Sequence, residues 1–316
     1  MLGVASLAGT DRFFLDEDGF AFTDEHPESL QATLEIFIDL LDEVERSGTV
    51  LAWDGIWDIQ ARSGRTLATL LFVPSEIDRD IRRLLGARFD KIQKYDETLN
   101  PSLTSICNGQ STGISPGISI CAEKRRSGRA ACCVTTNQSG RIGDVEISDG
   151  AGDAILAPFL VQADQVPDFW RFALDVERAP NIEIHEVACW AFPQLTFAPG
   201  VWRQVRRFVG PAETSRRLLL QNLAGLNDHA PSVWREEVQS HVIAARMKVL
   251  AGVDCSLESP NTHNNSAAMR EREVDFDGRI VMCEWHAKLE PHQNRVHFKV
   301  QDDRVYVGIF TDHLST

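Results

Sequence analysis

Apolar residues recur at three- and four-residue spacing in several parts of the chain, and this pattern predicts amphipathic helices. The first stripe comprises Leu30, Leu34, Phe37, Ile38, Leu41 and Val44, with Gly48 as a natural stop. A second helix is predicted after Ser75, with Asp78 near its start, and a short third one after Ser115-Pro116. Two longer helices are predicted over residues 212–227 and 232–250. The apolar positions expected in the last of these are Val233, Val238, Val242 and Val249.

Short apolar runs bounded by glycine and polar residues predict strands between these helices. One run covers residues 49–53, and three more, over 130–136, 142–147 and 154–161, predict a meander. A strand or hairpin that turns at Asp18-Gly19 is predicted over residues 11–26. Residues 100–117 are rich in Ser, Thr, Gly and Pro and therefore predict a linker.

These elements predict an α+β fold with a mostly helical body and small antiparallel sheets. The predicted parts are a helical N-terminal domain (1–100), a small α+β domain with the meander (101–180), a helical region (181–251) and a C-terminal antiparallel sheet (252–316) packed on the preceding helices. A length of 316 residues is sufficient for two or three domains, each with a buried core.

The last sheet carries the most informative alternation of side chains. In a strand over residues 279–288, His286 and Lys288 share a face, while Cys283 and Trp285 share the other. In the next strand, over 294–300, Arg295 and His297 face one way, and Val296 and Phe298 the other. The sheet is therefore predicted to have one apolar face and one face with histidine, lysine and arginine.

That polar face has the residue types that phosphodiester chemistry requires. Histidine carries a proton at neutral pH, and lysine and arginine stabilise charge on phosphate oxygens. The candidate catalytic residues are His286, Lys288, Arg295, His297 and His313. The alternative is a solvated sheet face on which Glu284 and Glu290 pair with the cations. Zinc bound by His286, His297 and His313 is a further alternative, but no H-x-x-x-H or H-E-x-x-H spacing supports it, so no metal and no cofactor are predicted.

Charge and cysteine usage narrow the function classes. A net charge of −14 argues against broad binding to a polyanion, so contact with nucleic acid would be confined to a local basic patch. Seven cysteines without a C-x-x-C pair argue against a disulfide framework or a structural zinc cluster. The apolar start of the chain has no basic segment, and no apolar run approaches eighteen residues. These features predict a cytoplasmic protein without membrane contact.

The segment Asn294 to Val300, the Gln301-Asp302-Asp303 turn, the run Arg304 to Phe310 and the final Asp312-His313 resemble the end of a RelE/HigB-type toxin domain. In that family two helices precede a small antiparallel sheet whose basic and histidine residues cleave RNA. The resemblance covers at most the last hundred residues. The family's domains are usually small and basic, whereas this chain is long and acidic, and the polar segment 254–268 interrupts the expected helix-to-sheet connection.

The resemblance implies a bacterial defence- or toxin-associated protein whose C-terminal domain binds or cleaves RNA by metal-independent acid/base chemistry, with RNA or the ribosome as partner. The alternative is a non-enzymatic accessory or adaptor subunit of a multiprotein defence system, with other proteins as partners. Arginines at 203, 206, 207, 216 and 217 are candidate contact residues for such a partner or for nucleic acid, and intramolecular ion pairing is the favoured alternative for them.

Overall fold

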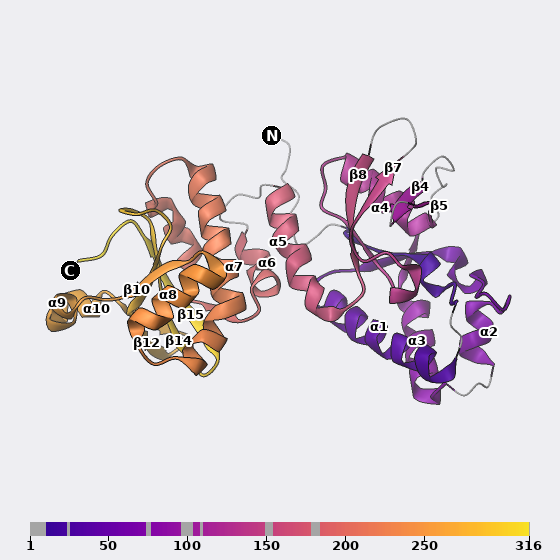
Figure 1. The fold of residues 1–316 in the computed structure, drawn as a ribbon, viewed down its shortest axis with the longest axis horizontal. Coiled ribbons are helices and arrows are strands. Elements are labelled where there is room, and N and C mark those ends of the chain that lie inside the picture. The colour runs from indigo at the N-terminus through magenta and orange to yellow at the C-terminus, as the bar shows by residue number, and fades with distance from the viewer. Residues whose placement is uncertain are drawn as a thin grey trace. The chain divides into compact units, whose positions relative to one another are not determined.

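The structure, a computed structural model, describes residues 11–23, 26–73, 77–95, 104–107, 110–148, 154–177 and 184–315. With 50% helix and 25% strand, the fold is mixed α/β. The chain divides into two compact units, Met1–Arg178 and Ala179–Thr316, and each is considered by itself (Figure 1). No helix within the described ranges combines the length and apolarity that a membrane span requires.

The N-terminal unit is built on one eight-stranded mixed sheet. From edge to edge its strands are β3 (Gln93–Tyr95), β2 (Val50–Trp53), β1 (Phe13–Leu15), β6 (Cys132–Val134), β8 (Ala154–Leu160), β7 (Gly143–Ser148), β4 (Thr104–Cys107) and β5 (Gln110–Gly113). The five strands from β3 to β8 are parallel to one another, and the last three are antiparallel to their neighbours. The prediction of small antiparallel sheets alone was therefore wrong.

The helices of this unit follow the apolar stripes and the capping residues of the sequence. They are α1 (Pro27–Ser47), α2 (Leu67–Phe72), α3 (Arg79–Lys91), α4 (Pro116–Arg126) and α5 (Val166–Val176). Every position of the stripe predicted for α1 is buried. Asp78 accepts hydrogen bonds from the first backbone N–H groups of α3, and Ser115 does so for α4. The basic last turn of α4 complements the negative end of the helix dipole.

Three local predictions for this unit differ from the structure. After β1 the chain forms a 3-10 turn (Glu17–Phe20) rather than a hairpin, because β1 pairs in parallel with β2 and β6. The predicted linker contains the β4–β5 hairpin, which joins the sheet through β7. The strands predicted as a meander exist, but β6 pairs with β8 and not with β7. The turn between the second and third of these strands, with its glycines at 150 and 152, lies outside the described residues.

The C-terminal unit contains a five-stranded mixed sheet and a two-stranded sheet. The larger sheet has the order β10 (Asp254–Leu257), β13 (Trp285–Lys288), β14 (Arg295–Gln301), β15 (Arg304–Thr311) and β9 (Leu195–Phe197). Its edge strand β9 is parallel to β15. The prediction of a purely antiparallel C-terminal sheet was therefore wrong. The smaller sheet pairs β11 (Glu273–Phe276) with β12 (Arg279–Met282). The helices are α6 (Ile184–Ala191), α7 (Ala212–Glu236), α8 (Ser240–Ala251), α9 (Pro260–Asn264) and α10 (Ser266–Arg270).

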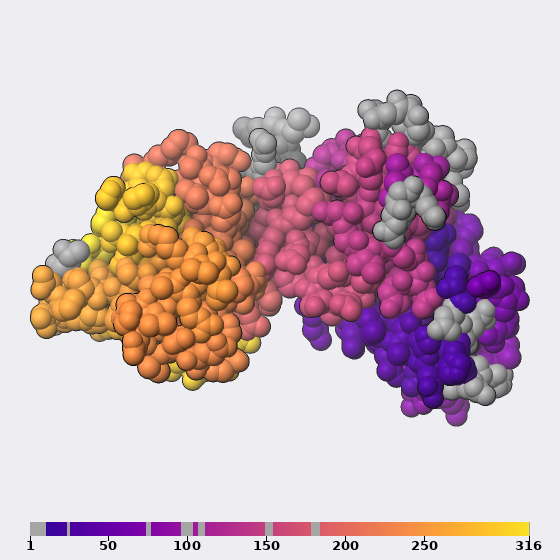
Figure 2. Space-filling model, in the orientation of Figure 1, coloured from indigo at the N-terminus to yellow at the C-terminus, as the bar shows by residue number. Residues whose placement is uncertain are grey.

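The apolar face of the larger sheet packs on α7, as predicted. Trp234 of α7 lies against Trp285 and Phe298, with ring centroids 4.8 and 5.8 Å away. On the side shown in Figure 2, orange residues form much of the surface of the C-terminal unit, and yellow residues are visible beside them. The predicted helix over 232–250 was wrong in its bounds, since α7 continues to Glu236 and α8 begins at Ser240. As a result Val238 and Val249 are 94% and 83% exposed instead of buried.

The predicted strand over residues 279–288 is two strands in two different sheets. β12 pairs with β11, and β13 pairs with β10 and β14. The chain changes sheets at Cys283-Glu284, where the N–H of Cys283 donates to the carbonyl of Arg272. Consequently the segment from Ser259 to Met282 is available to cover the polar face of the sheet, where Phe276 stacks edge-on against Tyr306.

The Glu17 carboxylate connects four elements of the N-terminal unit. Its oxygens accept hydrogen bonds from the Trp53 N–H (3.0 Å), the Tyr95 hydroxyl (3.2 Å) and the Gly117 N–H at the start of α4 (2.9 Å). Gly117 is required here because a Cβ at that position would lie 1.8 Å from the carbonyl oxygen of Leu15. Burial, offset in part by these donors, raises the pKa of Glu17 from 4.5 to about 7.

This shift makes the stability of the unit dependent on pH. A carboxyl group with a higher pKa in the folded than in the unfolded state favours folding when protonated, so the free energy of unfolding falls as pH rises from about 4.5 to about 7. Between pH 5 and 8 we expect the wild type to lose about 2 kcal/mol relative to Glu17→Gln, measured by urea unfolding. Titrating groups remote from Glu17 affect both proteins alike. Parallel pH profiles for the two proteins would contradict the role given to Glu17.

Candidate metal centre

Three polar residues lie side by side on neighbouring strands of the C-terminal sheet. Ser256 on β10 is in register with His286 on β13, and His286 is in register with His297 on β14. Side chains at paired positions project from the same face of a sheet. The period-two pattern thus brings the two histidines together, as the sequence predicted.

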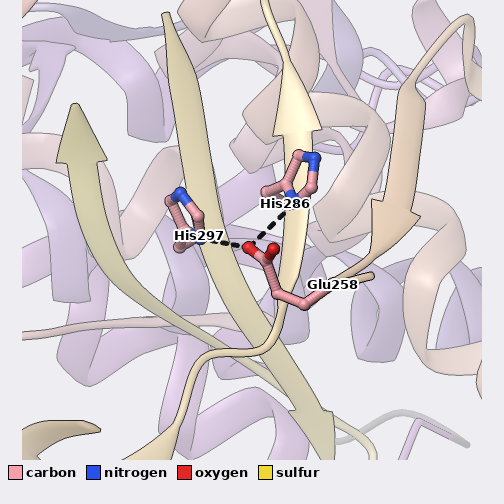
Figure 3. Close-up of side chains that lie close together, drawn as sticks. All are labelled: Glu258, His286 and His297. Carbon is pink, nitrogen blue, oxygen red and sulfur yellow. Dashed lines mark ion pairs between the residues drawn. The ribbon is translucent and has the colours of Figure 1, made fainter. Parts of the chain in front are cut away.

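Glu258 completes the cluster from the chain segment that follows β10. Its N–H donates to the carbonyl of Glu284, which fixes the turn at the end of the strand. The carboxylate then points back to both rings, as Figure 3 shows. Its Oε1 atom lies 3.3 Å from Nδ1 of His286 and 3.6 Å from Nδ1 of His297. Among the described residues, Glu258, His286 and His297 form a group whose ligand atoms all lie within 4.8 Å of one another.

The cluster is buried, yet most of its polar atoms have no hydrogen-bond partner. Glu258, His286 and His297 are 7%, 6% and 0% exposed. Nδ1 of His286 and both nitrogens of His297 have no hydrogen bond of acceptable geometry, whereas Oε1 of Glu258 forms an ion pair with Arg272. Buried polar atoms in native proteins are almost always paired, because an unpaired one costs about 1–3 kcal/mol. A proton or a metal ion bound between these atoms would supply the missing partner.

Ser256 determines which nitrogen of His286 faces the carboxylate. Its hydroxyl lies 3.1 Å from Nε2 of His286. When Nε2 carries the proton and donates it to Ser256, the lone pair of Nδ1 points to Oε1 of Glu258. Hydrogen bonds of this kind orient metal-binding histidines in proteins.

Arg272 holds the other side of Glu258. Its Nε lies 2.9 Å from Oε1, and its remaining nitrogens donate to the carbonyls of Ala268 (2.6 Å) and Ser315 (3.0 Å). The side chain is 1% exposed, so the guanidinium is enclosed by these three acceptors. Arg272 thereby fixes the carboxylate and joins the α9–α10 segment to the end of the chain.

The surroundings lower the pKa of both Glu258 and His297, for different reasons. Burial alone would raise the pKa of Glu258, but the interactions with His286 and Arg272 outweigh it and lower the pKa to about 2. Burial, together with His286, lowers the pKa of His297 to about 3. The cluster thus presents an ionised carboxylate and a neutral imidazole, the forms that bind metal ions.

The distances fit a tetrahedral metal ion. Zinc lies about 2.0–2.1 Å from histidine nitrogen and carboxylate oxygen, so two ligand atoms of one tetrahedral ion are about 3.3 Å apart. The distances from Oε1 of Glu258 to Nδ1 of His286 and to Nδ1 of His297, 3.3 and 3.6 Å, agree with this separation. Two nitrogens and one oxygen also form a donor set that zinc accepts in proteins.

The other predicted site residues lie outside this group. Lys288 is half-buried, with its Nζ 3.6 Å from Oδ1 of Asp254. Arg295 is in register with Lys288 and is half-buried on the same face. His313 is exposed, and its Nε2 lies 3.0 Å from the carbonyl of His292. The predicted alternative of a zinc site with His313 differs from the group seen here, in which Glu258 is the third member.

Sequence reasoning missed Glu258 and Arg272. Glu258 lies in the polar segment 254–268 that interrupts the expected helix-to-sheet connection, and Arg272 follows that segment; charged residues in such stretches are normally solvated. One usable signal was present, since Glu258 continues the alternation of β10 two residues beyond Ser256. The burial of the two histidines also means that neither ring, as it lies, is open to a phosphodiester.

Comparisons of the chain with protein-family models, with curated proteins and with solved structures found no match. The resemblance of residues 294–313 to RelE/HigB-type toxins therefore remains a prediction.

Replacing Glu258 with glutamine should destabilise the protein strongly. The substitution removes the negative charge beside Arg272 and leaves a buried, unpaired guanidinium, which costs about 3–5 kcal/mol. Urea unfolding would measure the loss. The matched control is Asp303→Asn, which breaks the exposed pair of Asp303 with Arg235 and should cost less than about 1 kcal/mol. Similar losses in both variants would show that the burial of the Glu258–Arg272 pair is not important.

Proposed function

We propose that the C-terminal unit is a metal-binding domain that holds a divalent transition-metal ion, best matched by zinc, between Glu258, His286 and His297. The observation that carries the proposal is the convergence of a buried carboxylate oxygen on the unpartnered nitrogens of two buried histidines, with Oε1 of Glu258 3.3 and 3.6 Å from the two Nδ1 atoms. The hydrogen bond between Ser256 and His286 and the ion pair of Glu258 with Arg272 would keep these ligands oriented.

The buried position of the ligands favours a structural role for the ion. Two histidines and a glutamate are a ligand set found in catalytic zinc sites, which keep an open fourth position for water or substrate, whereas structural sites are closed. The burial of all three ligands here is the feature of a closed site. The ligands come from three separate segments, the end of β10, β13 and β14. An ion that binds all three only in the folded state stabilises that state by mass action.

Metal analysis tests this proposal directly. Protein purified without chelator should contain about one zinc ion per chain by elemental analysis, and His297→Gln and His286→Gln should contain almost none. Added zinc should raise the melting temperature of the wild type, and a chelator should lower it.

The matched control is His241→Gln, which replaces an exposed histidine on α8. Its metal content and its response to zinc should equal those of the wild type. A wild type that takes up no zinc, cobalt or nickel, or an equal loss of metal in His241→Gln, would refute the proposal.

A second proposal retains the RNA-binding or RNA-cleaving activity that the resemblance implies. It is supported by the cross-strand pair of Lys288 and Arg295, which places two cations side by side on one face. Phosphate groups interact favourably with such pairs. His313, exposed on the residues that follow β15, would be the accessible proton carrier.

Incubation of the protein with RNA, alone and with ribosomes, tests the second proposal. RNA cleavage should disappear in His313→Ala and Arg295→Ala and persist in His241→Gln. RNA bound without cleavage would narrow the proposal to binding. If a protein partner co-purifies and neither RNA binding nor cleavage is detected, the accessory-subunit alternative would be favoured instead.

A further inference from the structure

A pocket of about 460 Å³ lies beside the 3-10 helix η6 (Val201–Arg207) in the C-terminal unit. One wall is η6 with the segment that follows it, and the other is the start of α7, at Ala212 and Ser215. The volume falls within the range of small-molecule sites. None of the proposed metal ligands lines this pocket, so it is separate from the Glu258 cluster.

Contacts with the larger sheet fix the position of the η6 wall. The N–H of Phe310 on β15 donates to Oε1 of Gln204 (3.1 Å), and the Trp202 ring lies edge-on to the Phe310 ring, with centroids 5.4 Å apart. After η6, the N–H and the carbonyl of Val209 both bond to the side-chain amide of Asn294, each at 2.8 Å. The pocket is therefore built on a rigid support.

The three-residue period of a 3-10 helix sorts the side chains of η6 into rows, because residues i and i+3 eclipse one another. Trp202 and Val205 form one row, and they are 8% and 6% exposed. Arg203 and Arg206 form the neighbouring row, and both are exposed. Both rows line the pocket. The pocket thus combines an apolar lining, which includes aromatic rings, with two guanidinium groups.

These two arginines are available to a ligand. The side chains of Arg203 and Arg206 form no ion pair or hydrogen bond with the described residues, so the intramolecular pairing favoured from the sequence is not seen for them. Among the described residues, no acidic side chain lines the pocket. In a chain with a net charge of −14, the pocket is therefore a local positive region.

We infer that this pocket binds a small aromatic compound that carries one oxyanion group. The oxyanion lies between Arg203 and Arg206, since guanidinium groups donate paired hydrogen bonds to carboxylates and phosphates. The ring lies against the aromatic side chains of Trp202 and Phe208. A cation would face the two arginines, and an inorganic anion would leave the apolar lining unused. RNA needs a longer basic surface than two arginines provide.

Isothermal titration with 2-naphthoate at physiological salt tests the inference. The wild type should bind it saturably. Neither 2-naphthamide, which has the ring without the charge, nor acetate, which has the charge without the ring, should bind. Arg203→Gln and Arg206→Gln should each weaken binding about fivefold or more. Ala212→Glu adds a carboxylate to the pocket wall at the first position of α7, where an acidic residue suits the helix dipole, and should abolish binding.

The matched control is Arg207→Gln, which removes the same charge from an exposed residue of η6 that does not line the pocket. Its affinity for 2-naphthoate should equal that of the wild type. Equal weakening in Arg207→Gln and Arg203→Gln would reduce the effect to net charge and overturn the inference. No saturable binding by the wild type, or equal binding of 2-naphthamide, would overturn it as well.

Two further ligands separate the sources of the oxyanion. Binding of 2-naphthyl phosphate more tightly than 2-naphthoate, with the same loss in Arg203→Gln, would support the inference and identify the group as a phosphate. Binding of a short polyuridine RNA that is lost in Arg203→Gln, without binding of either naphthyl compound, would overturn the inference in favour of RNA.

Discussion

The burial of a glutamate is the constraint on which each unit of this protein depends. A carboxylate removed from water must be supplied with donors or cations, since an uncompensated one costs several kcal/mol. In the N-terminal unit Glu17 meets this need with backbone and hydroxyl donors from β2, β3 and α4. In the C-terminal unit Glu258 meets it with Arg272 and two histidines. In both cases the donors come from elements far apart in the sequence, so satisfying the carboxylate also fixes the packing.

The two solutions have different chemical consequences. The hydrogen-bond donors around Glu17 are neutral and do not outweigh the effect of burial, so its pKa rises to about 7. Those around Glu258 are His286 and the permanent cation Arg272, which together outweigh burial, so its pKa falls to about 2 and the group stays ionised. The first site therefore responds to pH near neutrality. The second keeps a fixed negative charge facing two imidazoles, and this is the more suitable arrangement for a metal ion.

The sequence predicted what local rules control and missed what tertiary contacts control. The α1 stripe and the caps Asp78 and Ser115 follow from spacing and side-chain chemistry, and they were found. The two-faced pattern of β13 and β14 also placed His286 beside His297. The sheet partners of β6 and the change of sheets at Cys283 leave no periodic signal, because long-range pairing decides them. Glu258 and Arg272 look like solvated loop residues until the fold closes over them.

A proton and a metal ion are two species that could bind within the Glu258 cluster. They differ in whether the nitrogens of His297 gain a partner. A proton on Nδ1 of His286 would form an ion pair with Glu258, but both nitrogens of His297 would remain unpartnered in a fully buried ring. An ion between the three residues accepts a lone pair from each imidazole and from the carboxylate. The cost is repulsion with Arg272, which the carbonyls of Ala268 and Ser315 reduce because they hold the guanidinium from the other side. The ion thus satisfies more buried atoms than the proton does.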